Sequence, residues 1–135
     1  MPEENVELSY RVAEAFNRRD VDGFVALMDE EVEVISRLAA MEGGYRGHDG
    51  VRRWWANLLD VIPDFTISDV EVRVPGGSDN LTFCLLHNRG HGGTSAAPLE
   101  ETLYILMRWR ASRCVWWKVF LTEQEALEAA AGLPE

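Results

Sequence analysis

Residues 51–62 read VRRWWANLLDVI, and this stretch carries the strongest helical signal in the chain. Apolar side chains recur there at i, i+3, i+4, i+7, i+8 and i+11: Val51, Trp54, Trp55, Leu58, Leu59 and Ile62. Such spacing places them along one face of a helix, and the proline that follows ends it. We therefore expect a long amphipathic helix in the middle of the chain, with its leucines and Ile62 in the core.

The residues before this stretch predict two more helices and a strand. Apolar side chains at helical spacing indicate a helix over residues 3–18. Asp20 is a good N-cap for a short second helix, because its side chain can accept a hydrogen bond from a free backbone N–H group. Residues 31–36 favour a strand, and residues 38–47, which include three glycines, favour a loop.

After the central helix, the apolar period changes to that of strands. Residues 65–74 alternate as a strand does, but the alternation slips near Ser68 and Asp69, which predicts a bulge. A capping box at residues 122–125 opens a last helix. Three further strands are predicted between these points, over residues 81–89, 99–110 and 113–121. Helices followed by a strand meander indicate a single α+β domain that spans residues 1–135.

The composition excludes several classes of protein. Hydrophobic residues make up 47% of the chain, which excludes a disordered protein, and the net charge of −10 opposes binding to nucleic acid. No apolar run reaches the roughly 20 residues of a membrane span, and the first residues lack the features of a signal peptide. Cys84 and Cys114 lie in apolar runs, which indicates buried, reduced thiols. We expect a cytoplasmic protein that binds neither nucleic acid nor membranes.

Three of the predicted strands are apolar on both faces. Residues 81–86, 103–107 and 114–117 do not alternate between apolar and polar side chains, as the strands of a sheet with one wet face would. Both faces of the sheet must therefore be covered, and a few short helices can cover only one. We expect a second subunit to cover the other face and form a homodimer. Coverage by loops and the last helix is the alternative.

Three short motifs occur in an order typical of one family. They are AFNRRDVDG at residues 15–23, YRGHDGVRRWW at residues 45–55 and EALEA at residues 125–129. With these motifs and this order of elements, the chain resembles the SnoaL-like polyketide cyclases of the nuclear transport factor 2-like superfamily. The resemblance implies a cone-shaped, cystatin-like α+β fold. In it, three to four helices pack on a curved, mostly antiparallel sheet and leave a pocket between them.

The resemblance also assigns residues to that pocket. In the family, alternate side chains of each long strand line the pocket, and the others face the dimer partner. Counted from a predicted hairpin turn at residues 111–112, Glu101 falls on the inner face. The other expected pocket residues are Leu103, Ile105 and Met107 on one strand, Trp117, Val119 and Leu121 on the next, and Trp55 on the central helix. They predict a site for a hydrophobic small molecule, without a cofactor.

The fold alone leaves two functions open, because many unrelated activities share it. One is a cofactor-independent cyclase, isomerase or dehydratase that acts on a hydrophobic substrate. The other is a non-catalytic module for ligand binding or structural dimerisation. Ketosteroid isomerases of the superfamily use an aspartate base and a tyrosine, and those positions fall at or near Ser36 and Val12 here. Neither side chain can do that work, so the ketosteroid isomerase mechanism is excluded.

Polyketide cyclases of the family instead use a strand carboxylate as general acid–base, assisted by a histidine on the neighbouring strand. Here His87 and Glu101 lie on the two arms of one predicted hairpin, so they are the candidate catalytic residues. The hairpin register decides whether they share a face, and the sequence leaves the register open. The alternative is that Glu100 or Glu101 pairs with Arg89 across the strands, with His87 at the rim.

No metal or nucleotide site is predicted. His87 and His91 are four residues apart, which suits ligands on a helix rather than on a strand, and no third ligand is evident. The glycine-rich residues 43–50 lack the lysine and the hydroxyl side chain of a phosphate-binding loop.

Overall fold

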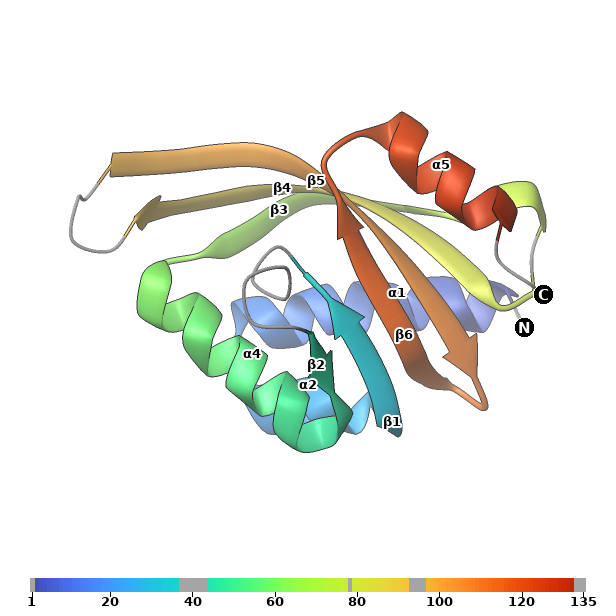
Figure 1. Cartoon of the computed structure of the whole chain (residues 1–135), viewed down its shortest axis with the longest axis horizontal. Coiled ribbons are helices and arrows are strands. Elements are labelled where there is room, and N and C mark those ends of the chain that lie inside the picture. The colour runs from blue at the N-terminus through green and yellow to red at the C-terminus, as the bar shows by residue number, and fades with distance from the viewer. Residues whose placement is uncertain (1, 37–43, 78, 93–96, 133–135) are drawn as a thin grey trace.

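The computed structural model describes residues 2–36, 44–77, 79–92 and 97–132 (Figure 1). The helices within these ranges are α1 (Pro2–Asn17), α2 (Val21–Ala26), α4 (Gly47–Val61) and α5 (Glu123–Gly132). The strands are β1 (Met28–Ile35), β2 (Tyr45–Arg46), β3 (Thr66–Arg73), β4 (Leu81–Gly92), β5 (Ala97–Arg110) and β6 (Arg113–Phe120). None of the described helices is long and apolar enough to cross a membrane.

The strands form one curved, mixed sheet in the order β2-β1-β6-β5-β4-β3. All neighbouring strands are antiparallel except β1 and β6, which are parallel. The long β4–β5 hairpin pairs from Leu81 opposite Arg108 to Gly92 opposite Ala97. This arrangement confirms the predicted α+β fold of helices on a curved, mostly antiparallel sheet.

Helices lie on both faces of the sheet. In Figure 1, α1, α2 and α4 lie below the sheet and α5 lies above it. On the side of α1, the main core is built around fully buried Phe16, Met28 and Val32. On the other side, Phe83, Leu106 and Phe120 pack against Ala126 of α5. The last helix therefore covers part of the second face, as the alternative to a dimer anticipated.

Local hydrogen bonds explain several element boundaries. The Asp20 carboxylate accepts a hydrogen bond from the Gly23 N–H at 2.9 Å and caps α2. The Thr122 hydroxyl accepts one from the Glu125 N–H at 3.2 Å at the start of α5. Ala111 and Ser112 both have positive φ, 50° and 66°, which suits a tight hairpin turn between β5 and β6. The predicted caps and hairpin turn are confirmed.

The predicted bulge in β3 is also confirmed. The register of β3 against β4 shifts between Ser68 and Glu71, and Asp69 has a φ of 52°. The extra residue changes which side chains face the helices, and this explains the slip in the apolar alternation.

Among the boundaries that differ from the sequence prediction are the start of β1 and the segment before α4. Strand β1 begins at Met28, three residues before the predicted start, because Met28 pairs with Cys114 of β6. The predicted loop over residues 38–47 lies partly outside the described residues. Within the described part, Tyr45 and Arg46 form β2 and pair with β1, and α4 already begins at Gly47. Both differences depend on partners distant in the sequence.

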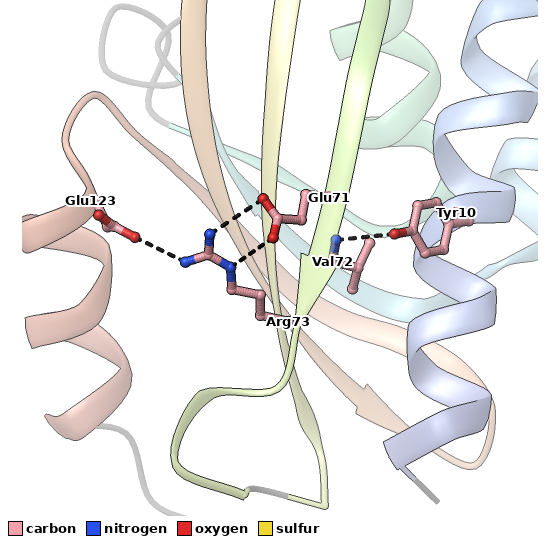
Figure 2. A network of polar contacts seen from close by, with 5 residues as sticks. All are labelled: Tyr10, Glu71, Val72, Arg73 and Glu123. Atoms are coloured by element: carbon pink, nitrogen blue, oxygen red, sulfur yellow. Dashed lines mark hydrogen bonds and ion pairs between the residues drawn. The ribbon is translucent and has the colours of Figure 1, made fainter.

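The edge strand β3 is tied to helices on both sides of the sheet (Figure 2). The Tyr10 hydroxyl of α1 accepts a hydrogen bond from the Val72 N–H at 3.3 Å. Arg73 pairs with Glu71 at 3.1 Å and with Glu123 of α5 at 3.2 Å. Because an edge strand exposes unpaired N–H groups, the contact with Tyr10 also shields one of them.

Candidate functional site

A cavity of about 450 Å³ lies between the helices of the main core and the inner face of the sheet. Its wall is mostly apolar and includes Val12 and Phe16 of α1, Trp54 and Leu58 of α4, and Ile62 directly after α4. The polar side chains in the wall are Ser9, Ser36, Asn88 and Glu101, apart from the Cys84 thiol. Leu58, Leu59 and Ile62 all pack against the core as expected, and Leu58 and Ile62 also line the cavity.

The structure places most of the predicted pocket residues in this wall. Leu103, Ile105 and Met107 of β5 line it, as do Trp117 and Val119 of β6. Leu121 does not, because β6 ends at Phe120 and the Leu121 side chain is 55% exposed.

The prediction for Trp55 was wrong. The Trp55 ring lies in the core, 4.8 Å from the Phe16 ring and 5.1 Å from the Phe24 ring. Trp54 lines the cavity instead, and its ring meets that of Trp117 edge-on at 4.8 Å. Adjacent helical residues point about 100° apart. The sequence shows that both tryptophans are on the apolar face, but the packing of α4 decides which one reaches the cavity.

The structure does not bring His87 and Glu101 together. In the β4–β5 register, His87 lies opposite Thr102, and Asn88 lies opposite Glu101. Because alternate strand residues face opposite sides, His87 and Glu101 are on different faces of the sheet. Only Glu101 lines the cavity. The expectation that His87 assists Glu101 is therefore wrong.

His87 instead takes part in an ion-pair cluster on the outer face. Its Nε2 lies 2.8 Å from Oε1 of Glu100, and Nη2 of Arg89 lies 3.4 Å from the same oxygen. The hydrogen bond with His87, followed by the charge of Arg89, lowers the pKa of the exposed Glu100 carboxyl. This is the cross-strand pairing with Arg89 that the sequence had left as an alternative, and Glu100 makes it.

Asn88 is a site residue that the sequence analysis missed. It is fully buried in the wall, on the same face of β4 as Cys84 and Leu86. The preceding residues on this face, Cys84 and Leu86, are apolar, so the amide at residue 88 interrupts the pattern. That interruption is the sequence signal that could have identified Asn88. Asn88 lies directly opposite Glu101 on the neighbouring strand, and the two residues form a polar patch in the wall.

The two cysteines are free and buried, as predicted. Burial raises the pKa of the Cys84 thiol to about 12, and burial also raises that of Cys114. At neutral pH the Cys84 thiol in the cavity wall is therefore protonated, and the thiolate is the nucleophilic form. Nucleophilic catalysis by Cys84 is not supported.

Metal ligation finds no support within the described ranges. No group of three or more His, Cys, Asp or Glu side chains there could hold a metal ion. Of the two histidines in the predicted pair, His87 contacts Glu100, and the side chain of His91 lies outside the described part.

Ser36 and Val12 both line the cavity. These are the positions to which the resemblance carries the catalytic groups of ketosteroid isomerases. The cavity thus has the location expected from the superfamily, but a hydroxyl and an aliphatic side chain replace the ionisable groups.

Comparison with known proteins identifies the family. The family model of the SnoaL-like domain matches residues 10–117. The chain belongs to the SnoaL-like family. This SnoaL-like domain matches no curated protein.

Solved structures share the fold of this SnoaL-like domain at low sequence identity. A nuclear transport factor 2-like protein of unknown function from Burkholderia pseudomallei has a TM-score of 0.77 and 19% identity, over 93% of this chain and 95% of that one. A proposed polyketide cyclase from Xanthomonas campestris has a TM-score of 0.75 and 15% identity, over 94% and 96%. TerC, co-crystallised with polyporic acid, has a TM-score of 0.72 and 14% identity, over 93% and 96%.

Proposed function

We propose that this SnoaL-like domain binds a mostly apolar small molecule in its cavity and that Glu101 exchanges a proton with that molecule. The observation that carries the proposal is a cavity of about 450 Å³ whose apolar wall contains the Glu101 carboxyl group. This volume lies within the range of about 300–1,000 Å³ that is usual for small-molecule sites. Among the described lining residues, Glu101 is the one carboxylic acid.

Glu101 is suited to acid–base chemistry by its surroundings. It is partly buried on the inner face of β5, which continues along the wall with Leu103 and Ile105. A carboxyl group next to a bound molecule can remove or return a proton, and an apolar wall limits competition from water. Cyclisation, isomerisation and dehydration all need such proton transfers. In this proposal Glu101 acts without His87 and without a cofactor.

The solved relatives agree with a small organic ligand. TerC was co-crystallised with polyporic acid, and the Xanthomonas campestris protein is a proposed polyketide cyclase. Their identity to this chain is too low to carry over a substrate, so the substrate class rests on the cavity itself.

Filling the cavity tests whether it is a binding site. The Ile105→Trp variant places an indole in the wall, so we expect the affinity for para-methylbiphenyl to fall at least about tenfold, with a stability cost of about 1–3 kcal/mol. Isothermal titration calorimetry measures the affinity. Tyr104→Trp, at the next position on the outer face, is the matched control and should bind like the wild type. Equal affinity in all three proteins, or no binding to the wild type, would contradict the proposal.

We also propose that a second copy of the chain covers the outer face of the sheet beside α5. Leu85, Tyr104 and Trp116 pack at the edge of the outer core and remain partly exposed. Sedimentation velocity at micromolar concentration is expected to show a dimer. A monomer at that concentration would overturn this proposal and leave α5 as the main cover of the outer face. The cytoplasmic location stays a prediction.

A further inference from the structure

A fully buried amide in the cavity wall has no hydrogen-bond partner among the described residues. Asn88 has 0% exposure, and neither its Nδ2 nor its Oδ1 is hydrogen-bonded within the described part of the chain. Leaving a buried donor and acceptor unpaired is costly, and most buried polar groups in proteins are paired. This exception therefore points to a partner that the described residues do not supply.

The strand geometry directs this amide toward the cavity. Cys84, Leu86 and Asn88 alternate along β4 and all line the cavity, whereas His87 faces the other side. Asn88 is the register partner of Glu101, and Cβ atoms of such pairs are about 4.5–5.5 Å apart. One group on a bound molecule can therefore contact both side chains.

Ile62, the C-cap residue of α4, packs against this part of the wall. Gly90 is the next residue after Asn88 on the same face of β4, and a Cβ atom at Gly90 would lie only 2.4 Å from Cγ2 of Ile62. The missing side chain thus lets Ile62 pack directly on the strand beside Asn88. An apolar side chain in this place offers the amide no hydrogen bond.

Two other polar groups of the wall, on Ser9 and Trp117, lie in different surroundings. The Ser9 hydroxyl is hydrogen-bonded to the Asn5 carbonyl and shares a bond with the Thr82 hydroxyl. Trp117 Nε1 lacks a partner within the described residues, but its ring meets Trp54 edge-on. Trp117 also pairs with Met107, six residues along β5 from Glu101, or about 20 Å on an extended strand. The patch of Asn88 and Glu101 therefore lies at the other end of the β5 wall from Trp117.

We infer that Asn88 is the hydrogen-bonding anchor for the ligand. It binds the oxygen of a hydroxyl or carbonyl group carried at one end of an apolar molecule and holds that group beside Glu101. Nδ2 donates to the oxygen, and Oδ1 accepts from the ligand when the group is a hydroxyl. This inference rests on the proposed function and adds the ligand's polar group and its orientation. Asn88 is in this account a positioning and specificity residue.

Two probes of nearly equal shape test the inference. para-Phenylphenol carries a hydroxyl group where para-methylbiphenyl carries a methyl group. Calorimetry gives the affinities of both for the wild type, for Asn88→Leu and for His87→Gln, which changes the adjacent residue on the outer face. We expect Asn88→Leu to lower the affinity for the phenol about tenfold and to leave the hydrocarbon affinity unchanged. His87→Gln should change neither.

The readout is the ratio of the two affinities within each variant, so a change in cavity shape that affects both probes cancels. Asn88→Ala provides the same readout if the leucine variant folds poorly. An unchanged ratio, with the hydrocarbon still bound, would overturn the role of Asn88 and leave the proposed function standing. Failure of both probes to bind the wild type would overturn the proposed function, and the inference with it.

Discussion

Replacing Phe16 by alanine is expected to lower the free energy of unfolding by about 3–5 kcal/mol. Phe16 is 1% exposed and stands at the centre of an aromatic cluster. Its ring lies 4.8 Å from that of Trp55, 5.5 Å from that of Phe65 and 6.1 Å from that of Trp54. These partners come from α4 and from the segment before β3, so the surrounding structure cannot collapse easily into the space left. Urea denaturation followed by fluorescence measures the loss.

A smaller substitution at the same position provides the control. Phe16→Leu keeps most of the apolar volume and is expected to cost clearly less than Phe16→Ala. If both variants lost less than about 1 kcal/mol, the cluster around Phe16 would not be the main source of stability in this part of the core.

Replacing Glu101 by glutamine is expected to reduce base catalysis in the cavity about a hundredfold, since positioned acid–base groups contribute about 10²–10⁴-fold to rates. The ring opening of nitrobenzisoxazole measures this without knowledge of the natural substrate. A base removes the carbon-bound proton of the ring, the nitrogen–oxygen bond breaks, and a coloured nitrile phenolate forms. Glutamine has nearly the same shape as glutamate but cannot take up the proton. The fold and the binding of an apolar probe should therefore be retained.

The neighbouring carboxylate supplies the matched control. Glu100→Gln removes an exposed carboxylate that is hydrogen-bonded to His87 on the opposite face, and we expect it to leave the rate unchanged. Equal rates in the wild type and in Glu101→Gln would contradict the proposed role of Glu101. If the apolar probe were still bound, such a result would favour the non-catalytic ligand-binding alternative.

Interactions between close neighbours in the sequence made many features predictable. The apolar spacing of residues 51–62 predicted α4, although the helix begins earlier, at Gly47. The slip near Asp69 predicted the bulge of β3, and Asp20 predicted the start of α2. Each depends on a turn of helix, a strand pleat or a capping hydrogen bond, so a few adjacent residues contain all the relevant information.

The arrangement of the candidate site depends on contacts between segments that lie far apart in the sequence. Sequence reasoning identified the inner face of β5, including Glu101, but paired it with His87 and overlooked Asn88. A shift of one residue in the hairpin register exchanges the two faces of a strand, and the sequence alone does not fix that register. The choice between Trp54 and Trp55 likewise depends on how α4 rotates against Phe16 and Phe24.

The sequence by itself determined the fold class, the family, the main elements and a mostly apolar inner face. Only the tertiary structure decided that Asn88 rather than His87 lies with Glu101 in the wall, that Trp54 reaches the cavity and that α5 covers part of the outer face. The physical reason is the distance along the chain over which each kind of interaction acts. Periodicity and capping act within a few residues, whereas strand register and helix rotation are set by the packing of segments that lie far apart in the chain.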